Sequence, residues 1–125
     1  MSLRVVCIED EADVIELLHL IVSRQGYEFI EARGGKNGIR VVEQIKPDLV
    51  LLDLNMPGLD GWDVYDHLQA NAETKHIPII IVTARAQYDQ RVTQMRIANA
   101  PNLVTKPFGP AELIEVMARM LKTSS

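Results

Sequence analysis

The sequence predicts an α/β fold, in which a parallel β-sheet has helices on both of its faces. Short runs rich in Val, Ile and Leu alternate five times with stretches of helical period, and this alternation is typical of a parallel sheet. The third and fourth runs are apolar on successive residues, as expected for strands that are covered on both faces. The chain has 125 residues, of which 47% are hydrophobic and 24% charged, so it suits one globular domain with a single core.

Five strands are expected, one at each apolar run. They cover residues 4–8, 28–32, 49–53, 77–82 and 103–105. Each run is short and is separated from the next by polar residues or by a stretch of helical period, which is the pattern of strands that alternate with helices.

Five amphipathic helices are expected, one after each strand. The first ends near Gly26, the second stops before Pro47, and the fifth begins at Pro110, which suits the first helical position. Apolar residues recur every three or four positions, so each helix has one face toward the core. These residues are Val14, Leu17, Leu18, Ile21 and Val22 in the first helix, Ile39, Val42 and Ile45 in the second, Trp62, Tyr65 and Leu68 in the third, Tyr88, Val92 and Met95 in the more polar fourth, and Leu113, Ile114, Met117, Met120 and Leu121 in the fifth.

Composition and charge exclude several classes of function. Thirteen basic against 17 acidic residues give a formal net charge of -4, and Lys and Arg form no cluster that suits a phosphate backbone, so we expect no direct binding of nucleic acid. The apolar runs are far shorter than the roughly 20 residues of a membrane span, so we expect no membrane association and a cytoplasmic location. The single cysteine, Cys7, permits no internal disulfide and is expected to be a small buried hydrophobic residue.

Polar and charged side chains follow the expected strands. Glu9 and Asp10 come after the first strand, Asp53 ends the third, Thr83 follows the fourth and Lys106 follows the fifth. In an open parallel sheet the binding crevice lies at the carboxyl ends of the strands. We therefore expect these five side chains to converge at one edge of the sheet.

Three carboxylates at one edge repel one another unless a cation neutralises them. Ligands that are all oxygen select a hard ion, and a site with few carboxylates and room for water and a phosphoryl group favours Mg²⁺. Lys106 and Thr83 supply a positive charge and a hydroxyl donor for phosphoryl oxygens. Asp53, at the mouth of a central strand, can then attack phosphorus in line and become an acyl phosphate.

Four short motifs occur in order along the chain. They are Glu9-Asp10-Glu11, then Asp53 followed by Met56-Pro57-Gly58 and Asp60-Gly61, then Thr83-Ala84, and finally Lys106-Pro107-Phe108. In this set and order the sequence resembles the receiver domain of two-component response regulators, the CheY-like superfamily, over essentially the whole chain. The resemblance implies a flavodoxin-like, doubly wound sheet of five parallel strands in the order 2-1-3-4-5, with five helices. It also implies phosphorylation of an aspartate by a histidine kinase or a histidine phosphotransfer protein.

The resemblance assigns the chemistry to matching residues. Asp53 matches the phosphoacceptor, and the Mg²⁺ ligands match Glu9, Asp10, Asp53 and the backbone carbonyl of Asn55. Such a domain catalyses its own phosphorylation and dephosphorylation and has no external substrate to turn over. We expect residues 1–125 to be a single receiver domain, either alone or as part of a longer protein.

The resemblance also implies how the signal leaves the site. The residues that match the phosphoryl-binding and switch positions are Thr83, Ala84 and Lys106. The modulatory positions are Asn55 and Arg85, which flank the route of the hydrolytic water, Leu103, and Pro107, whose peptide bond is usually cis in the family. Output is expected to pass to a further domain or an effector protein through the fourth helix, the fifth strand and the fifth helix.

Three positions depart from the family pattern. Leu103 stands where most receiver domains have Tyr or Phe, Asn99 occupies a glycine position, and Pro101 precedes the last strand. The aromatic relay of the switch is therefore missing, and an interaction module that works without phosphate is one alternative. A phosphohydrolase of the haloacid dehalogenase type is another, because it also forms an aspartyl phosphate. That family has its nucleophile on the first strand and needs a second Asp where this chain has Asn55.

Overall fold

Five parallel strands form a single sheet in the order β2-β1-β3-β4-β5. The computed structural model describes residues 3–54, 56, 61–83, 103–106 and 108–124, without the side chains of 122–124. The strands are β1 (Arg4–Ile8), β2 (Glu28–Ala32), β3 (Leu49–Asp53), β4 (Ile79–Thr83) and β5 (Leu103–Thr105). The α/β class and the flavodoxin-like strand order are therefore confirmed.

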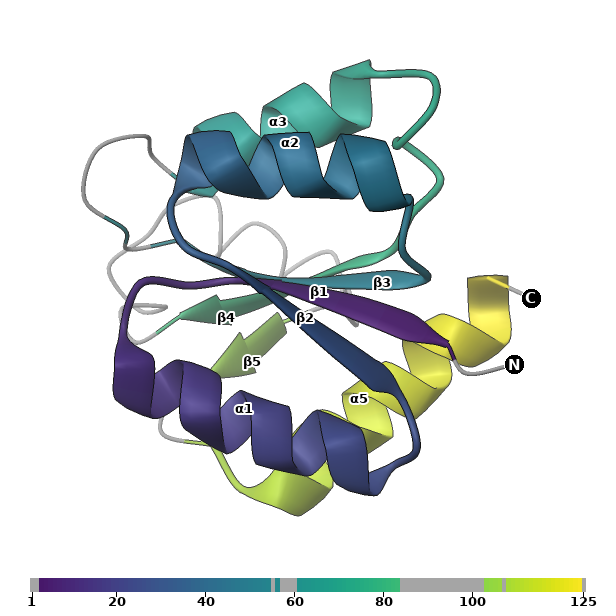
Figure 1. The fold of residues 1–125 in the computed structure, drawn as a ribbon. Coiled ribbons are helices and arrows are strands. Elements are labelled where there is room, and N and C mark those ends of the chain that lie inside the picture. The colour runs from purple at the N-terminus through teal and green to yellow at the C-terminus, as the bar shows by residue number, and fades with distance from the viewer. Residues whose placement is uncertain (1–2, 55, 57–60, 84–102, 107, 125) are drawn as a thin grey trace.

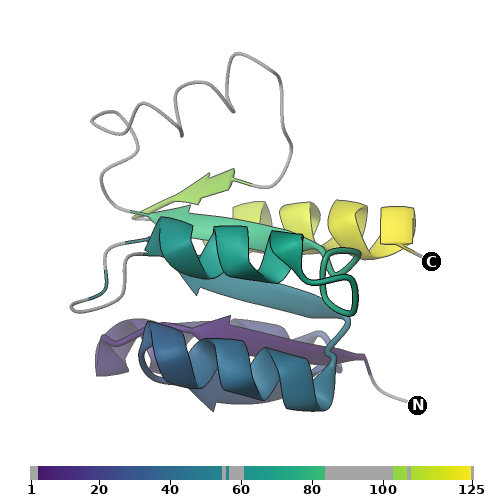
Figure 2. The same cartoon turned by 90° about the horizontal axis from the view of Figure 1, so that it is seen from above.

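Helices cover both faces of the sheet. α1 (Ala12–Arg24) and α5 (Pro110–Ser124) lie on one face, and α2 (Gly35–Ile45) and α3 (Gly61–Ala70) lie on the other (Figure 1). Seen from above, α2 lies over the β1 side of its face and α3 lies closer to β3 (Figure 2). These four match predicted helices, whereas the expected fourth helix, around Tyr88, Val92 and Met95, lies outside the described residues. None of the described helices is long and apolar enough to cross a membrane.

The core has two layers, one on each face of the sheet. Alternate residues of a strand point to opposite faces, so Cys7 packs against α1 and α5 whereas its neighbours Val6 and Ile8 pack against α2 and α3. All five residues of β3 and all five of β4 are buried, which confirms the prediction from their apolar runs. Cys7 is buried as well, as expected from its position in an apolar run.

β4 begins two residues later than predicted and ends one residue later, at Thr83. The physical reason is Pro78, which has no N–H to donate to the sheet. The Pro78 carbonyl accepts the Val50 N–H at 3.0 Å, but Ile77 belongs to the preceding turn, where its N–H donates to the Thr74 carbonyl at 3.0 Å. Thr83 is therefore the last residue of the strand and not the first residue after it.

The buried face of α1 differs from the predicted stripe. Leu17 was expected in the core but is 43% exposed, whereas Ile15, which the stripe leaves out, is buried beside Leu18. Apolar residues are so frequent in this helix that two overlapping stripes fit the helical period. Packing against β2 and α5 decides which of the two stripes is buried.

Leu18→Ala is expected to lower the free energy of unfolding by about 3 kcal/mol, because it leaves a cavity at a side chain that is 1% exposed. Leu17→Ala, on the same helix, is expected to cost less than about 1 kcal/mol, because the Leu17 side chain is already largely in water. Urea unfolding followed by circular dichroism measures both values. Equal losses would mean that Leu17 belongs to the core after all.

Candidate functional site

Glu9 and Asp53 lie side by side at the carboxyl ends of β1 and β3. The register pairs Cys7 with Leu51, and two residues further along the two strands are Glu9 and Asp53. Because alternate residues share a face, both carboxylates fall on the side of the sheet where α1 and α5 pack. Glu9 is 1% exposed and Asp53 3% exposed, so the site begins with two buried acidic groups.

Lys106 brings a positive charge to both carboxylates. It follows β5, and its N–H donates to the Thr83 carbonyl at 2.8 Å, which holds its backbone beside the end of β4. Its Nζ donates to Glu9 Oε2 at 3.2 Å and lies 3.7 Å from Asp53 Oδ1. One ammonium group therefore bridges two buried carboxylates from separate strands.

The Glu9 carboxyl is a weaker acid in the fold than in water. Burial raises its pKa to about 7 because the charged form loses hydration, and the neighbouring Asp53 charge adds to the rise. Lys106 and the Glu11 N–H, which donates to Glu9 Oε1 at 3.3 Å, act in the opposite direction. Burial also raises the pKa of the Cys7 thiol, so Cys7 stays neutral at pH 7.

The raised pKa of Glu9 predicts that stability falls as the pH rises from about 4.5 to about 7 in the absence of metal. Folding raises this pKa, so the folded chain is favoured while Glu9 is protonated, and the advantage is lost as the pH rises through the folded pKa. Glu9→Gln cannot ionise and is expected to be more stable than the native chain by about 1 kcal/mol or more at pH 8, with the difference shrinking toward pH 4.5. Urea unfolding in EDTA measures this difference. A difference that does not change with pH would contradict the prediction.

The other predicted site residues are only partly placed. Thr83 is buried at the end of β4, and Asp10 follows Glu9 and is half-buried. Across the part of the chain that the structure describes, no three carboxylate, imidazole or thiol groups lie close enough together to hold a metal ion. The gathering of Asp10 with Glu9 and Asp53 thus stays a prediction. Four further predicted residues lie outside the described ranges: Asn55, Ala84, Arg85 and Pro107.

Leu103, at the position where the family usually has an aromatic residue, begins β5 and is half-buried. It pairs with Ile81 of β4 and packs in a small apolar cluster with Leu54 and two aromatic residues of α3, Trp62 and Tyr65. These two rings meet edge to face, with centroids 5.4 Å apart. Aromatic residues of α3 therefore pack against the same small cluster as Leu103.

The sequence does not indicate the contact between Lys106 and Glu9. It predicts that Lys106 binds a phosphoryl oxygen and that a divalent cation neutralises the carboxylates. Glu9 and Asp53 stand at the ends of neighbouring strands, as the sequence predicts. No local pattern indicates where the long side chain of Lys106 ends.

The donor set suits a hard divalent cation. Two buried carboxylates share one ammonium group, so the site keeps a net negative charge when both are ionised. Carboxylate oxygens are the preferred protein ligands of such ions, and a further carboxylate, that of Asp10, follows directly after Glu9. The oxygen donors of Glu9 and Asp53 therefore suit a magnesium ion, and Asp10 is the candidate for a third carboxylate.

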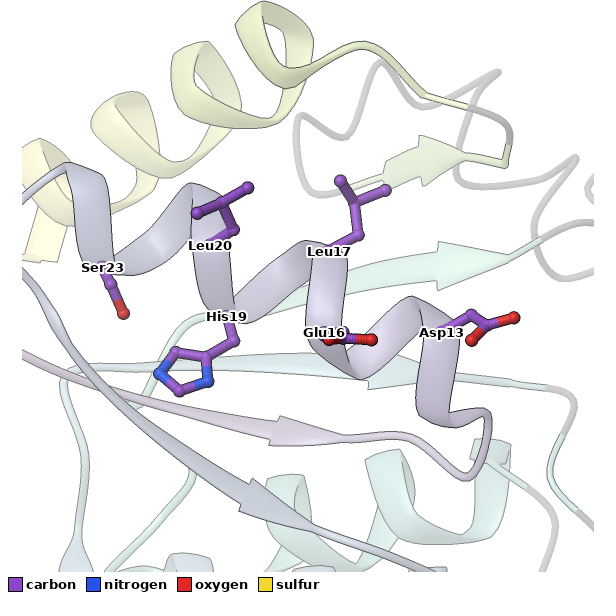
Figure 3. A pocket seen from close by; sticks show the side chains of 6 residues that line it. All are labelled: Asp13, Glu16, Leu17, His19, Leu20 and Ser23. Carbon is purple, nitrogen blue, oxygen red and sulfur yellow. The ribbon is translucent and has the colours of Figure 1, made fainter.

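A hollow of about 540 Å³ lies on the outer surface of α1 (Figure 3). Its lining residues are Asp13, Glu16, Leu17, His19, Leu20 and Ser23. Leu17 and Leu20 point to one side of the helix, and His19 points to another, where its ring stacks on Phe29 with centroids 4.7 Å apart. Neither Asp53 nor Lys106 lines the hollow, so it is separate from the charged site.

Comparison with known families supports one interpretation of this geometry. The family model that matches the chain is the response regulator receiver domain, and the match covers residues 5–118. The chain is a response regulator receiver domain. In this receiver domain the buried aspartate ends β3, not the first strand, so nothing supports the haloacid dehalogenase alternative.

Curated relatives of the receiver domain include transcriptional regulators. The phosphate regulon transcriptional regulatory protein PhoB of Escherichia coli is 30% identical over 125 residues, which are 100% of this chain and 54% of PhoB. Protein PilH of Pseudomonas aeruginosa is 32% identical over 118 residues, which are 94% of this chain and 97% of PilH. The receiver domain thus spans about half the length of PhoB and nearly the whole of PilH.

Solved structures share the fold over almost the whole chain. The receiver domain of a sensor histidine kinase from Pseudomonas aeruginosa is 25% identical, with a TM-score of 0.87, and the alignment covers 98% of this chain and 99% of that one. That structure has a magnesium ion coordinated in its active-site cleft. A putative response regulator from Chloroflexus aurantiacus is 26% identical, with a TM-score of 0.86 and the same coverage of both chains.

Proposed function

We propose that this receiver domain accepts a phosphoryl group on Asp53 and acts as a phosphorylation switch in two-component signal transduction. The observation that carries the proposal is the position of Lys106 Nζ, 3.7 Å from Asp53 Oδ1 and 3.2 Å from Glu9 Oε2. A fixed cation beside a buried carboxylate stabilises the negative charge that an entering phosphoryl group brings.

The proposed donor is a phosphohistidine of a histidine kinase or of a histidine phosphotransfer protein. A carboxylate oxygen of Asp53 forms a bond to phosphorus while the phosphorus–nitrogen bond of the donor breaks, and the released nitrogen takes up a proton. Lys106 can turn its ammonium from the carboxylates to a phosphoryl oxygen without leaving the site, because it already contacts Asp53.

Glu9, Asp10, Asp53 and the backbone carbonyl of Asn55 are the proposed ligands of Mg²⁺. When bound, Mg²⁺ neutralises charge on the phosphoryl oxygens and offsets the repulsion between the carboxylates. Support comes from the two buried carboxylates that share one ammonium group. The magnesium ion in the active-site cleft of the Pseudomonas aeruginosa receiver domain gives further support.

Thr83, Ala84 and Lys106 are proposed to bind the phosphoryl group and to carry the switch. The hydrogen bond from the Lys106 N–H to the Thr83 carbonyl joins the ends of β4 and β5, so a shift at one residue is passed to the other. The proposed modulatory residues are Asn55 and Arg85 for the lifetime of the acyl phosphate, and Leu103 and Pro107 for the response of β5 and its following loop.

Output is proposed to pass through the predicted fourth helix, β5 and α5 to a further domain or an effector protein. Residues 1–125 are proposed to form one receiver domain with a cytoplasmic location and to bind neither nucleic acid nor a membrane directly.

Acetyl phosphate tests the proposal on the intact chain. One phosphoryl group per chain is expected in the peptide that contains Asp53, and none is expected when EDTA removes Mg²⁺. Intact-mass and peptide mass spectrometry measure the stoichiometry and the site. Label on another residue, or labelling that does not depend on Mg²⁺, would contradict the proposal.

A further inference from the structure

Gly61, the first residue of α3, touches the main chain that carries Asp53. Its N–H donates to the Leu54 carbonyl at 3.4 Å. A β-carbon at Gly61 would overlap the Leu54 Cα, and it would lie 2.7 Å from the Asp53 carbonyl oxygen and 3.0 Å from the Leu54 carbonyl carbon. This close approach requires glycine at position 61.

The atoms that such a β-carbon would meet cannot easily move aside. Asp53 is the last residue of β3, which is hydrogen-bonded to β1 on one side and to β4 on the other. A main-chain shift here turns the Cα–Cβ direction of Asp53 and moves its carboxylate, which lies 3.7 Å from Lys106 Nζ. The close contact at Gly61 therefore helps to fix the direction in which the Asp53 carboxylate points.

Trp62 adds a second contact between α3 and the same segment. It packs in the apolar cluster that contains Leu54, Ile81 and Leu103, and Tyr65 meets its ring edge to face. The first turn of α3 thus contacts this segment through the main chain at Gly61 and through the packing of Trp62 against the cluster that contains Leu54.

We propose that Gly61 is a positioning residue for phosphoryl transfer. Because it has no side chain, the first turn of α3 can sit on the main chain of Asp53 and Leu54 and fix the direction of the Asp53 carboxylate toward Lys106. This inference rests on the proposed function of Asp53. In-line attack on phosphorus depends on alignment, and a misplacement of about 1 Å can cost as much as a hundredfold in rate.

Gly61→Ala is the test, and Gly38→Ala is its matched control. Gly38 is also a buried helix glycine, but a β-carbon there would lie 2.7 Å from side-chain atoms of Ile8 and not against main chain. Phosphorylation with saturating acetyl phosphate and Mg²⁺ gives the maximal rate constant and the fraction of chains labelled, and circular dichroism gives the folded fraction. Gly61→Ala is expected to lower the rate constant about tenfold or more, and Gly38→Ala is expected to leave it unchanged.

A purely structural role for Gly61 predicts a different result. Partial unfolding would lower the labelled fraction while the rate constant of the folded chains stays at the native value, and that outcome would overturn the inference. If Gly61→Ala does not fold, Trp62→Ala loosens the same turn from Leu54, and a native rate constant in folded Trp62→Ala overturns the inference equally. A native chain without label at Asp53 would instead refute the proposed function itself.

Discussion

Asp53→Asn is expected to abolish phosphorylation by acetyl phosphate, with a loss of at least about a thousandfold. The amide keeps the shape of the carboxylate but has no anionic oxygen to attack phosphorus. The substitution also removes one of the two negative charges beside Lys106 Nζ, which lowers the repulsion on Glu9. The variant is therefore expected to stay folded, so that the loss reports on chemistry alone.

Asp63→Asn is the matched control for this prediction. Asp63 is exposed on α3, so the same change of side chain is made outside the buried site. It is expected to be labelled at the native rate. Mass spectrometry after acetyl phosphate treatment measures both variants, and thermal unfolding checks that both are folded. Labelling of Asp53→Asn at the native rate would mean that another residue is the acceptor.

Lys106→Met is expected to lower the free energy of unfolding by about 3 kcal/mol at pH 8 in EDTA. The substitution leaves Glu9 and Asp53 buried without their shared cation, while Met retains much of the apolar stem of lysine. The loss is expected to be smaller at pH 5. Lys106 lowers the pKa of Glu9, so without it the Glu9 carboxyl takes up a proton more readily and no longer needs a partner charge.

The double variant Lys106→Met with Glu9→Gln separates charge from packing. It is expected to recover most of the stability that Lys106→Met loses at pH 8, because the unpaired Glu9 carboxylate causes most of the loss. A double-mutant cycle measures this recovery. It compares the urea unfolding of the native chain, both single variants and the double variant at pH 5 and pH 8. If the double variant is as unstable as Lys106→Met, Lys106 acts through the packing of its stem and not through its charge.

Four of the five strands have the bounds that the apolar runs predict, because a run buried on both faces leaves little choice of strand position. β4 is the exception. Its apolar run includes Pro78, which has no N–H to donate to the sheet, so the strand begins later than the run does. Leu17 is a similar case on α1, where two apolar stripes satisfy the helical period and only one can face the core. Both differences arise where packing or hydrogen bonding chooses between patterns of nearly equal apolar content.

The fold class and the acidic and basic residues at the edge of the sheet can be inferred from the sequence alone. Parallel strands that alternate with helices bring their carboxyl ends to one edge, so the positions of Glu9, Asp53 and Lys106 along the chain already place them together. These positions follow from local periods and from topology, which a single sequence carries. The roles of these residues follow from the motifs and are left to the experiments above.

Which atoms of the site come into contact depends on the three-dimensional packing. The ammonium of Lys106 bridges Glu9 and Asp53, and Gly61 rests on the main chain of Asp53 and Leu54. A lysine side chain has four rotatable bonds and a glycine has no side chain at all, so neither residue carries a local pattern that points to its partner. Their contacts depend on how the strand ends and the start of α3 are positioned in space, and packing of the whole sheet against its helices sets that position.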